Sequence, residues 1–333
     1  MSMATIVPEI EQSPALGGTR TALIHEVEIG LTKSPRTLSP WMFYDAYGSC
    51  LFERITALPE YYPFRIEREI LGQFAQEVLD RLRPDLSNAL RVFELGAGTA
   101  AKTGLLLEAA MRGHGQVTYE PCDISADALN RACTSIESLL PGVRLQPTVR
   151  NYVTDPPRLA HGEGTVLAIY IGSSIGNFSP EAARAILRNL HTQLRRGDGL
   201  LLGTDMVKDV EILLAAYDDR EGVTAEFNLN ILRRLNRELG ADFDFAWFQH
   251  RARWNRAESR IELHLESLRG QYVRIPEADL VAHFAKGETI HTENSYKFTK
   301  KTLAALLDEA GFEVRQTWMD PLRWYALTLA SPR

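Results

Sequence analysis

The chain has little cysteine and no long apolar run, and these absences narrow what it can be. Its 333 residues include only three cysteines, Cys50, Cys122 and Cys133, and no two of them form a C-x-x-C pair. The cysteines therefore indicate neither a disulfide framework nor a zinc site. The longest apolar runs are of strand length, so we expect no membrane partner. We expect a protein of the reducing cytoplasm.

Basic tracts and histidine pairs are also missing. The net charge is −6, and lysine and arginine form no stripe. This balance disfavours a nucleic-acid partner, because phosphate contacts supply most of the affinity in such complexes. The eight histidines form no H-x-x-x-H pair, so we expect no metal. We expect a monomer that acts on a small molecule.

A glycine-rich turn follows the first clear strand pattern. Gly96 and Gly98 stand between the strand pattern of residues 90–95, whose apolar members are Leu90, Val92, Phe93 and Leu95, and a helical pattern that starts near Leu105. Glycines allow close approach of a ligand to the backbone, and the first N–H groups of a helix are free to bind it. The turn therefore predicts a nucleotide site. Its spacing leaves both NAD and S-adenosylmethionine open, as does Asp123, which ends the next strand pattern where a ribose diol is held.

A third strand pattern, residues 165–171, leads into the polar sequence from Gly172 to Asn177. Ser179 and Pro180 then have the residue types that begin a helix. Asn177 is therefore expected at the carboxyl edge of the sheet, where open α/β sheets bind their ligands.

Four stretches together resemble the histidine Nα-methyltransferases. They are residues 43–52 (FYDAYGSCLF), 58–63 (LPEYYP), 172–177 (GSSIGN) and 202–205 (LGTD). This conjunction is more specific than any single glycine loop, and the likeness covers nearly the whole chain. The family uses S-adenosylmethionine to make hercynine, the trimethylated histidine on the route to ergothioneine. The resemblance implies the same cofactor and three methyl transfers to the α-amino nitrogen of histidine.

The order of elements agrees with an α/β fold, a Rossmann-like class I methyltransferase sheet with helices on both faces. A helix is expected over residues 67–82, and strands are expected near residues 90–95, 117–122, 143–149, 165–171, 198–204, 312–318 and 324–330. Two closing strands suit the methyltransferase version of this fold.

Residues 205–298 break the alternation of helices and strands. We predict that they join residues 1–64 in a discontinuous α+β substrate-binding domain. Residues 65–204 and 299–333 would then form the S-adenosylmethionine-binding domain. A chain of this length is large enough for two domains.

The resemblance assigns cofactor contacts to the first two strand ends. Gly96 and Lys102 match the family's contacts to the methionine end, with Gly98 in the same turn, and Asp123 matches its ribose contact. Each has a simpler alternative: a tight turn for the glycines, a solvated helix lysine for Lys102, and a strand-end cap for Asp123.

The adenine contact departs from the family pattern. Where the family often has an acidic residue to receive the adenine amino group, this chain has Asn151 and Tyr152. The Asn151 amide oxygen can still accept that hydrogen bond, and Tyr152 offers a ring to the base.

The resemblance also assigns substrate contacts. Asn177 and Tyr217 match residues that hold the α-carboxylate and orient the amine, Gly172 stands in the same loop as Asn177, and Tyr61 matches a residue that reaches the substrate side chain. Without the resemblance, Tyr217 would be a helix tyrosine at a domain surface and Tyr61 a packing residue.

Glu293 and Ser295 stand two residues apart in an extended pattern, so their side chains share one side. A carboxylate and a hydroxyl can address both imidazole nitrogens, which favours histidine over tryptophan. The alternative for this pair is a solvated strand edge.

Tyr44 and Phe52 are expected to flank the amine, because aromatic faces stabilise the cation that forms as methyls accumulate. Tyr44 and Asn177 are the catalytic candidates. Leu263 stands where some relatives carry methionine, which leaves room for a shifted preference. The alternatives are methylation of another aromatic amino acid such as tryptophan, an NAD-dependent oxidoreductase, and a sensor that binds the cofactor without turnover.

Overall fold

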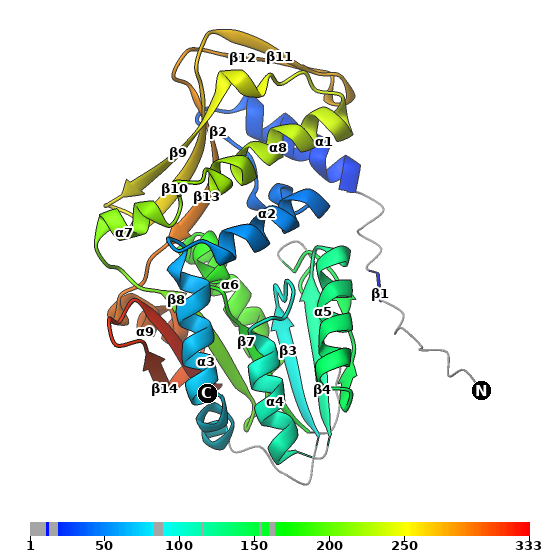
Figure 1. Ribbon diagram of the computed structural model, residues 1–333, viewed down its shortest axis with the longest axis vertical. Helices are drawn as coiled ribbons and strands as arrows, with labels where there is room; N and C mark the ends of the chain where they lie inside the picture. The colour runs from blue at the N-terminus through cyan, green and yellow to red at the C-terminus, as the bar shows by residue number, and fades with distance from the viewer. Residues whose placement is uncertain (1–10, 13–18, 83–88, 115, 153–154, 160–163) are drawn as a thin grey trace, which may run out of the picture.

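The computed structural model describes residues 11–12, 19–82, 89–114, 116–152, 155–159 and 164–333. Two parts are stacked along the long axis, a large sheet flanked by helices and an upper part with a smaller sheet (Figure 1). The helices are α1 (Thr19–Thr32), α2 (Ala46–Ala57), α3 (Tyr62–Leu82), α4 (Thr103–Gly113), α5 (Ala126–Leu139), α6 (Pro180–His191), α7 (Val210–Ala215), α8 (Val223–Leu239) and α9 (Lys300–Glu309). None of them, in the part of the chain that is described, is long and apolar enough to cross a membrane.

The strands of the large sheet confirm the expected class I methyltransferase fold. They are β1 (Glu11–Gln12), β3 (Leu90–Leu95), β4 (Val117–Asp123), β5 (Val143–Leu145), β6 (Thr148–Val149), β7 (Thr165–Tyr170), β8 (Gly199–Asp205), β14 (Phe312–Met319) and β15 (Tyr325–Pro332). Their order is β1-β6-β4-β3-β7-β8-β15-β14, with β5 also paired to β4. The strands from β6 to β8 are parallel, and β15 is antiparallel to both β8 and β14. Strands β14 and β15 are the two closing strands that the sequence predicts.

Two expected boundaries were wrong. The single strand expected at residues 143–149 is split into β5 and β6, because Pro147 lies between them and has no N–H to donate to the ladder. Helix α3 begins at Tyr62 rather than at Glu67. Its second residue, Pro63, is tolerated there because the first turn of a helix needs no N–H donor.

Helices cover both faces of the large sheet. Val92 belongs to the core cluster that includes Leu71 of α3 and Leu107 of α4, whereas its neighbour Phe93 belongs to the cluster that includes Leu187 of α6. Consecutive strand residues point to opposite faces, so both faces are buried. The carboxyl ends of these strands therefore form the accessible edge, and they point toward the upper part.

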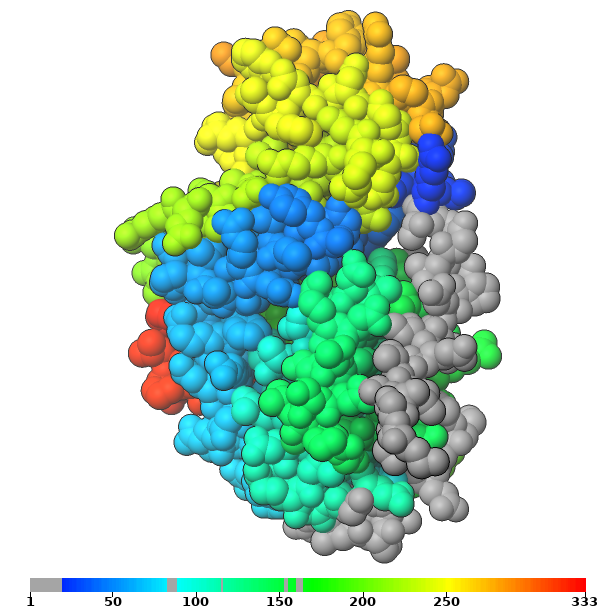
Figure 2. Space-filling view, turned by 45° about the vertical axis from the view of Figure 1, so that its right-hand side comes forward, coloured from blue at the N-terminus to red at the C-terminus, as the bar shows by residue number. Residues whose placement is uncertain are grey.

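The upper part is built from segments far apart in sequence. Helices α1, α2 and α8 share an apolar core with β9 (Phe248–Asn255), β10 (Arg260–Ser267), β11 (Gln271–Ile275), β12 (Leu280–Phe284) and β13 (Thr289–Tyr296), and β2 (Arg36–Thr37) pairs with β13. The smaller sheet has the order β2-β13-β10-β9, and β11 pairs with β12. Figure 2 shows α2, in blue, above the cyan and green residues of the large sheet's helices, with a narrow hollow between them.

The predicted domain division remains a prediction. Ile261 and Leu263 of β10 belong to the same core cluster as residues of α3 and β3, so apolar packing is continuous between the two parts. Residues 1–10 and 13–18 of the predicted N-terminal segment lie outside the described residues.

Candidate active site

The glycine turn after β3 is tied to the end of β4. Gly96 and Gly98 have φ angles of +66° and +53°, a backbone region that glycine adopts without steric cost. The Gly98 N–H donates to one Asp123 carboxylate oxygen at 2.9 Å, and the Ser125 N–H donates to the other at 2.9 Å. Burial raises the pKa of Asp123, and these N–H groups lower it in part. A Cβ on Gly98 would meet nothing within 4 Å, so the space beside the turn is open.

The predicted adenine residues lie at the same edge. Val149, the last residue of β6, is paired with Asp123, and Asn151 follows two residues later. The hydroxyl of Tyr152 lies 3.5 Å from the position of a Cβ on Gly96 and 3.2 Å from the Tyr170 hydroxyl. The structure thus brings all six predicted cofactor residues to the ends of the adjacent strands β6, β4 and β3.

Lys102 is not a solvated helix lysine, so that alternative is wrong. Its ammonium donates to Glu67 of α3, whose side chain is fully buried. Glu67 also accepts from the Gly172 N–H at 2.8 Å and from the Tyr325 hydroxyl at 2.7 Å. A Cβ on Gly172 would lie 3.4 Å from the Lys102 Nζ. Through these hydrogen bonds Glu67 links Lys102, which follows the glycine turn, to the loop after β7.

A cavity lies between that loop and the upper part. It encloses about 580 Å³ of empty space, counted with its open mouth. Every residue predicted for the substrate or for catalysis lines it: Tyr44, Phe52, Tyr61, Gly172, Asn177, Tyr217, Leu263, Glu293 and Ser295. The two sets of predicted residues, cofactor and substrate, meet at Gly172 and Lys102.

One wall of the cavity is polar and buried. Glu293 and Ser295 are 9% and 3% exposed, and β13, which carries them, is an inner strand between β2 and β10. The solvated strand edge is therefore wrong for this pair. Glu293 accepts from the Asn177 side-chain amide at 3.1 Å. Burial raises the pKa of Glu293 to about 7, against the opposing charge of Lys297.

The other wall is aromatic. The Phe52 ring lies 5.9 Å from the Tyr44 ring and 6.2 Å from the Tyr61 ring between centroids, and Tyr61 lies 6.2 Å from Tyr217. Phe227 of α8 completes the wall, 5.8 Å from Tyr44, and the sequence analysis missed it. Within the described residues, the hydroxyls of Tyr44 and Tyr61 have no hydrogen-bond partner. The wall therefore offers ring faces and two free hydroxyls to a ligand.

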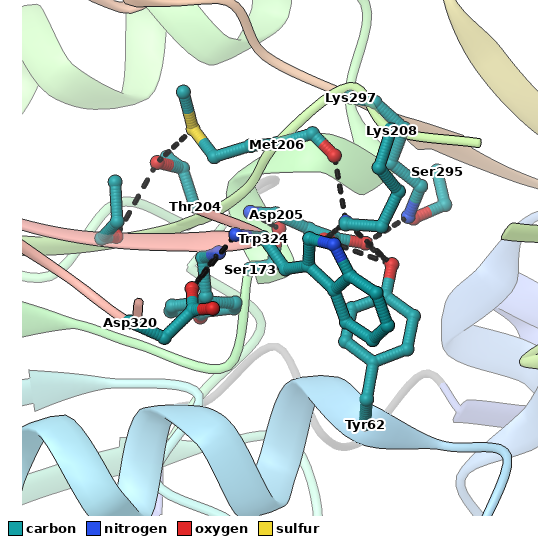
Figure 3. Close-up of polar contacts among 12 residues, drawn as sticks. Tyr62, Ser173, Thr204, Asp205, Met206, Lys208, Ser295, Lys297, Asp320 and Trp324 are labelled. Atoms are coloured by element: carbon teal, nitrogen blue, oxygen red, sulfur yellow. Dashed lines mark hydrogen bonds and ion pairs between the residues drawn. The ribbon is translucent and has the colours of Figure 1, made fainter. Parts of the chain in front are cut away.

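A buried charged cluster behind the cavity was also missed (Figure 3). Asp205, at the end of β8, accepts from the Tyr62 hydroxyl at 2.9 Å and pairs with Lys297 at 2.8 Å and with Lys208. Burial alone would raise the pKa of Asp205, but the two ammonium groups lower it overall. Lys297 also donates to the Tyr217 hydroxyl at 2.9 Å, so the cluster contacts the cavity lining.

Comparisons with known proteins agree with this geometry. A family model described as histidine-specific methyltransferase, SAM-dependent, matches residues 23–332. The histidine N-alpha-methyltransferase of Mycolicibacterium smegmatis is 41% identical over 309 residues, which cover 93% of this chain and 94% of that one. The enzyme of the same name from Mycobacterium tuberculosis is 42% identical over 311 residues, covering 93% and 95%.

A more distant relative acts on another amino acid. The L-tryptophan methyltransferase of Psilocybe serbica is 26% identical over 332 residues, which cover 90% of this chain and 89% of that one. The family match contradicts the NAD-dependent alternative. This chain belongs to the family of S-adenosylmethionine-dependent, histidine-specific methyltransferases.

Proposed function

We propose that this enzyme transfers methyl groups from S-adenosylmethionine to the α-amino nitrogen of L-histidine, three times in succession, to give hercynine. One observation carries the proposal. The cavity has a buried polar wall, formed by Glu293, Asn177 and Ser295, opposite a wall of aromatic rings. At Gly172 the cavity lies next to Lys102, which follows the glycine turn after β3. This combination fits a small zwitterion with a polar ring whose amine becomes a cation.

The carboxyl edge of the sheet fits the cofactor, which supplies an electrophilic methyl group on a sulfonium. Asp123 uses each carboxylate oxygen for one backbone N–H. A carboxylate has about four acceptor sites, so it can still receive the ribose hydroxyls. Lys102 is placed to bind the methionine carboxylate, and Asn151 and Tyr152 to bind the adenine.

Each transfer is an in-line displacement. The nitrogen lone pair forms a bond to the methyl carbon, the carbon–sulfur bond breaks, and its electron pair stays on sulfur. The amine must be neutral to react, so the substrate's ammonium group loses one proton to solvent before each of the three attacks. The chain's contribution is orientation and exclusion of water: Asn177 holds the α-carboxylate, the Tyr217 oxygen accepts from the amine and so orients it, and Tyr61 contacts the substrate side chain.

The aromatic wall accounts for repeated methylation. A trimethylated nitrogen is a permanent cation that can no longer donate a hydrogen bond. Tyr44, Phe52 and Phe227 face the cavity with their rings within 6.0 Å of one another in pairs, and ring faces attract such a cation. The wall therefore stabilises the product of each step as well as the substrate of the next.

The polar wall accounts for selectivity. The Glu293 carboxylate accepts from one imidazole nitrogen, and the Ser295 hydroxyl addresses the other. Indole has a single N–H and no second ring nitrogen, so tryptophan can bind Glu293 but leaves the Ser295 hydroxyl without a partner.

We propose that the enzyme works as a monomer of the cytoplasm. Its three free cysteines suit the reducing cytoplasm.

The test is to incubate the purified enzyme with S-adenosylmethionine and each amino acid separately, and to measure products by mass spectrometry. We expect one, two and finally three methyl additions to histidine, and much slower product formation from tryptophan. Asn177→Ala is the matched inactive control. Faster methylation of tryptophan would contradict the substrate, and no methylation of any amino acid would support the sensor alternative instead.

A further inference from the structure

The ammonium of Lys297 uses all three of its N–H donors within the protein. Its Nζ lies 2.8 Å from a carboxylate oxygen of Asp205, 2.9 Å from the Tyr217 hydroxyl and 2.8 Å from the Ser295 hydroxyl. The side chain is 0% exposed. An ammonium has three N–H donors and no acceptor. Both hydroxyl oxygens therefore accept a hydrogen bond from Lys297.

The two hydroxyls also bind each other. The Tyr217 and Ser295 oxygens are 2.7 Å apart, so one of them donates to the other. Neither can donate to Lys297, which has no lone pair. Of the two hydroxyl hydrogens, one is used inside the pair and the other remains for the cavity, which both residues line. The pair thus presents one O–H donor to a ligand.

We propose that Lys297 is a positioning residue that determines specificity: it makes the Tyr217–Ser295 pair a hydrogen-bond donor toward the cavity and so selects a ring that carries an acceptor nitrogen as well as an N–H group. The inference rests on the proposed function and names the source of its selectivity. Neutral imidazole has one N–H, which donates a hydrogen bond to Glu293, and one acceptor nitrogen, which receives the hydrogen bond from the Tyr217–Ser295 pair. Indole and phenyl rings leave the buried donor unpaired, which costs binding free energy.

The cluster behind Lys297 supplies a matched control (Figure 3). Lys208 binds the same carboxylate of Asp205, and it also donates to the Tyr62 hydroxyl at 2.7 Å and to the Met206 carbonyl at 2.7 Å. Within the described residues it forms no hydrogen bond with Tyr217 or Ser295. When Lys297 is replaced, Asp205 keeps Lys208 and Tyr62 as partners, so the carboxylate is not left buried without compensation.

The experiment compares Lys297→Met with Lys208→Met in the full-length enzyme. Binding of L-histidine and of L-tryptophan to enzyme saturated with S-adenosylhomocysteine is measured by calorimetry. For Lys297→Met we expect histidine affinity to fall roughly 10- to 100-fold, the effect of losing one directed hydrogen bond in a buried site, and tryptophan affinity to stay within about twofold. For Lys208→Met the ratio of the two affinities should stay unchanged.

Two further measurements separate this role from a merely structural one. If Lys297 acts through Ser295, the variants are not additive, and Lys297→Met in a Ser295→Ala background should cost histidine affinity less than about twofold more. Equal losses for histidine and tryptophan, or full additivity with Ser295→Ala, would overturn the proposal. A wild-type enzyme that binds histidine with this selectivity but transfers no methyl would overturn the proposed function and leave this inference standing.

The pH profile gives an independent readout. Burial raises the pKa of Glu293 to about 7, and Lys297 is the charge that lowers it. Tyr44, Tyr61 and Tyr217 also face it, and burial raises their pKa values, so they stay neutral. The His291 ring bonds to the Glu293 carbonyl at 3.0 Å, and burial lowers the pKa of His291, so this ring is neutral near pH 7. Lys297→Met should move the acidic limb of histidine binding to higher pH, whereas Lys208→Met should leave it nearly in place. An unmoved limb in Lys297→Met contradicts the inference.

Discussion

Replacing Glu293 with glutamine should weaken histidine methylation and stabilise the empty enzyme. Glutamine keeps the shape of the side chain, and its amide oxygen can still accept from Asn177, which lies 3.1 Å from the carboxylate. The bond to the imidazole N–H loses its charge. A hydrogen bond to a charged group is worth about 1.5–3 kcal/mol and a neutral one about 0.5–1.5 kcal/mol, so the loss is about 1–1.5 kcal/mol. At pH 8, kcat/KM for histidine should therefore fall roughly tenfold.

The stability effect has the opposite sign. Burial raises the pKa of Glu293 from 4.5 to about 7, so the folded chain holds this proton more tightly than the unfolded chain does. Ionisation therefore destabilises the fold as pH rises from 4.5 to 7, and the cost is complete above pH 7. At about 1.36 kcal/mol per pH unit, it reaches about 3 kcal/mol at pH 8. The glutamine variant does not titrate, so it should be more stable by about that amount.

Urea unfolding at pH 8 and pH 5.5 measures this difference. The advantage of Glu293→Gln should shrink by about 2 kcal/mol at the lower pH, because most of the wild-type carboxyl is then protonated in the folded state. Glu288→Gln is the control, since Glu288 pairs with Arg36 at 2.7 Å outside the cavity. It should leave kcat/KM unchanged. A difference in unfolding free energy between Glu293→Gln and wild type that is the same at both pH values would contradict the buried, titrating carboxyl. An equal loss of kcat/KM for tryptophan would contradict the contact between Glu293 and the imidazole.

Three further changes test other parts of the site. Lys102→Met leaves the buried Glu67 without its cation, so the free energy of unfolding should fall by about 3–5 kcal/mol. Adding Glu67→Gln should restore stability but not affinity for S-adenosylhomocysteine in calorimetry, and recovery of both would contradict the cofactor role of Lys102. Gly172→Ala forces a side chain onto a residue with φ +82°, so Tm and kcat should both fall, at a cost of about 1–2 kcal/mol. Phe52→Leu removes one ring from the aromatic wall, so mono- and dimethylhistidine should accumulate severalfold in mass spectra; an unchanged product ratio would exclude this role.

The strand positions and the cavity lining were accessible from sequence for a simple reason. Glycine turns and polar loops that follow successive buried strands must meet at one edge of a parallel sheet, so Gly96, Asp123 and Asn177 are brought together by topology alone. The period-two rule also placed Glu293 and Ser295 on one side of β13.

The same rule would have found Lys297. It stands two residues after Ser295, on the same side of the extended segment, and in the structure its ammonium binds Tyr217 and Asp205. Glu67 carried a similar signal, because it lies three and four residues before Ile70 and Leu71 on the apolar face of α3. A charge on a buried face indicates a partner.

Phe227 gave no such signal. It is one of several apolar residues on α8, and nothing in the local sequence separates a residue that lines the cavity from one that fills the core. Its role depends on how the upper part packs over the sheet, which is a tertiary property.

The most direct test of the proposed function is a crystal structure of the enzyme with S-adenosylhomocysteine and L-histidine. We expect cofactor density at the ends of β3 and β4, beside Asp123, and histidine in the cavity with its imidazole between Glu293 and Ser295. The α-amino nitrogen should face the cofactor sulfur across a gap that one methyl group fills. Histidine bound elsewhere, or an amine turned away from that sulfur, would contradict it.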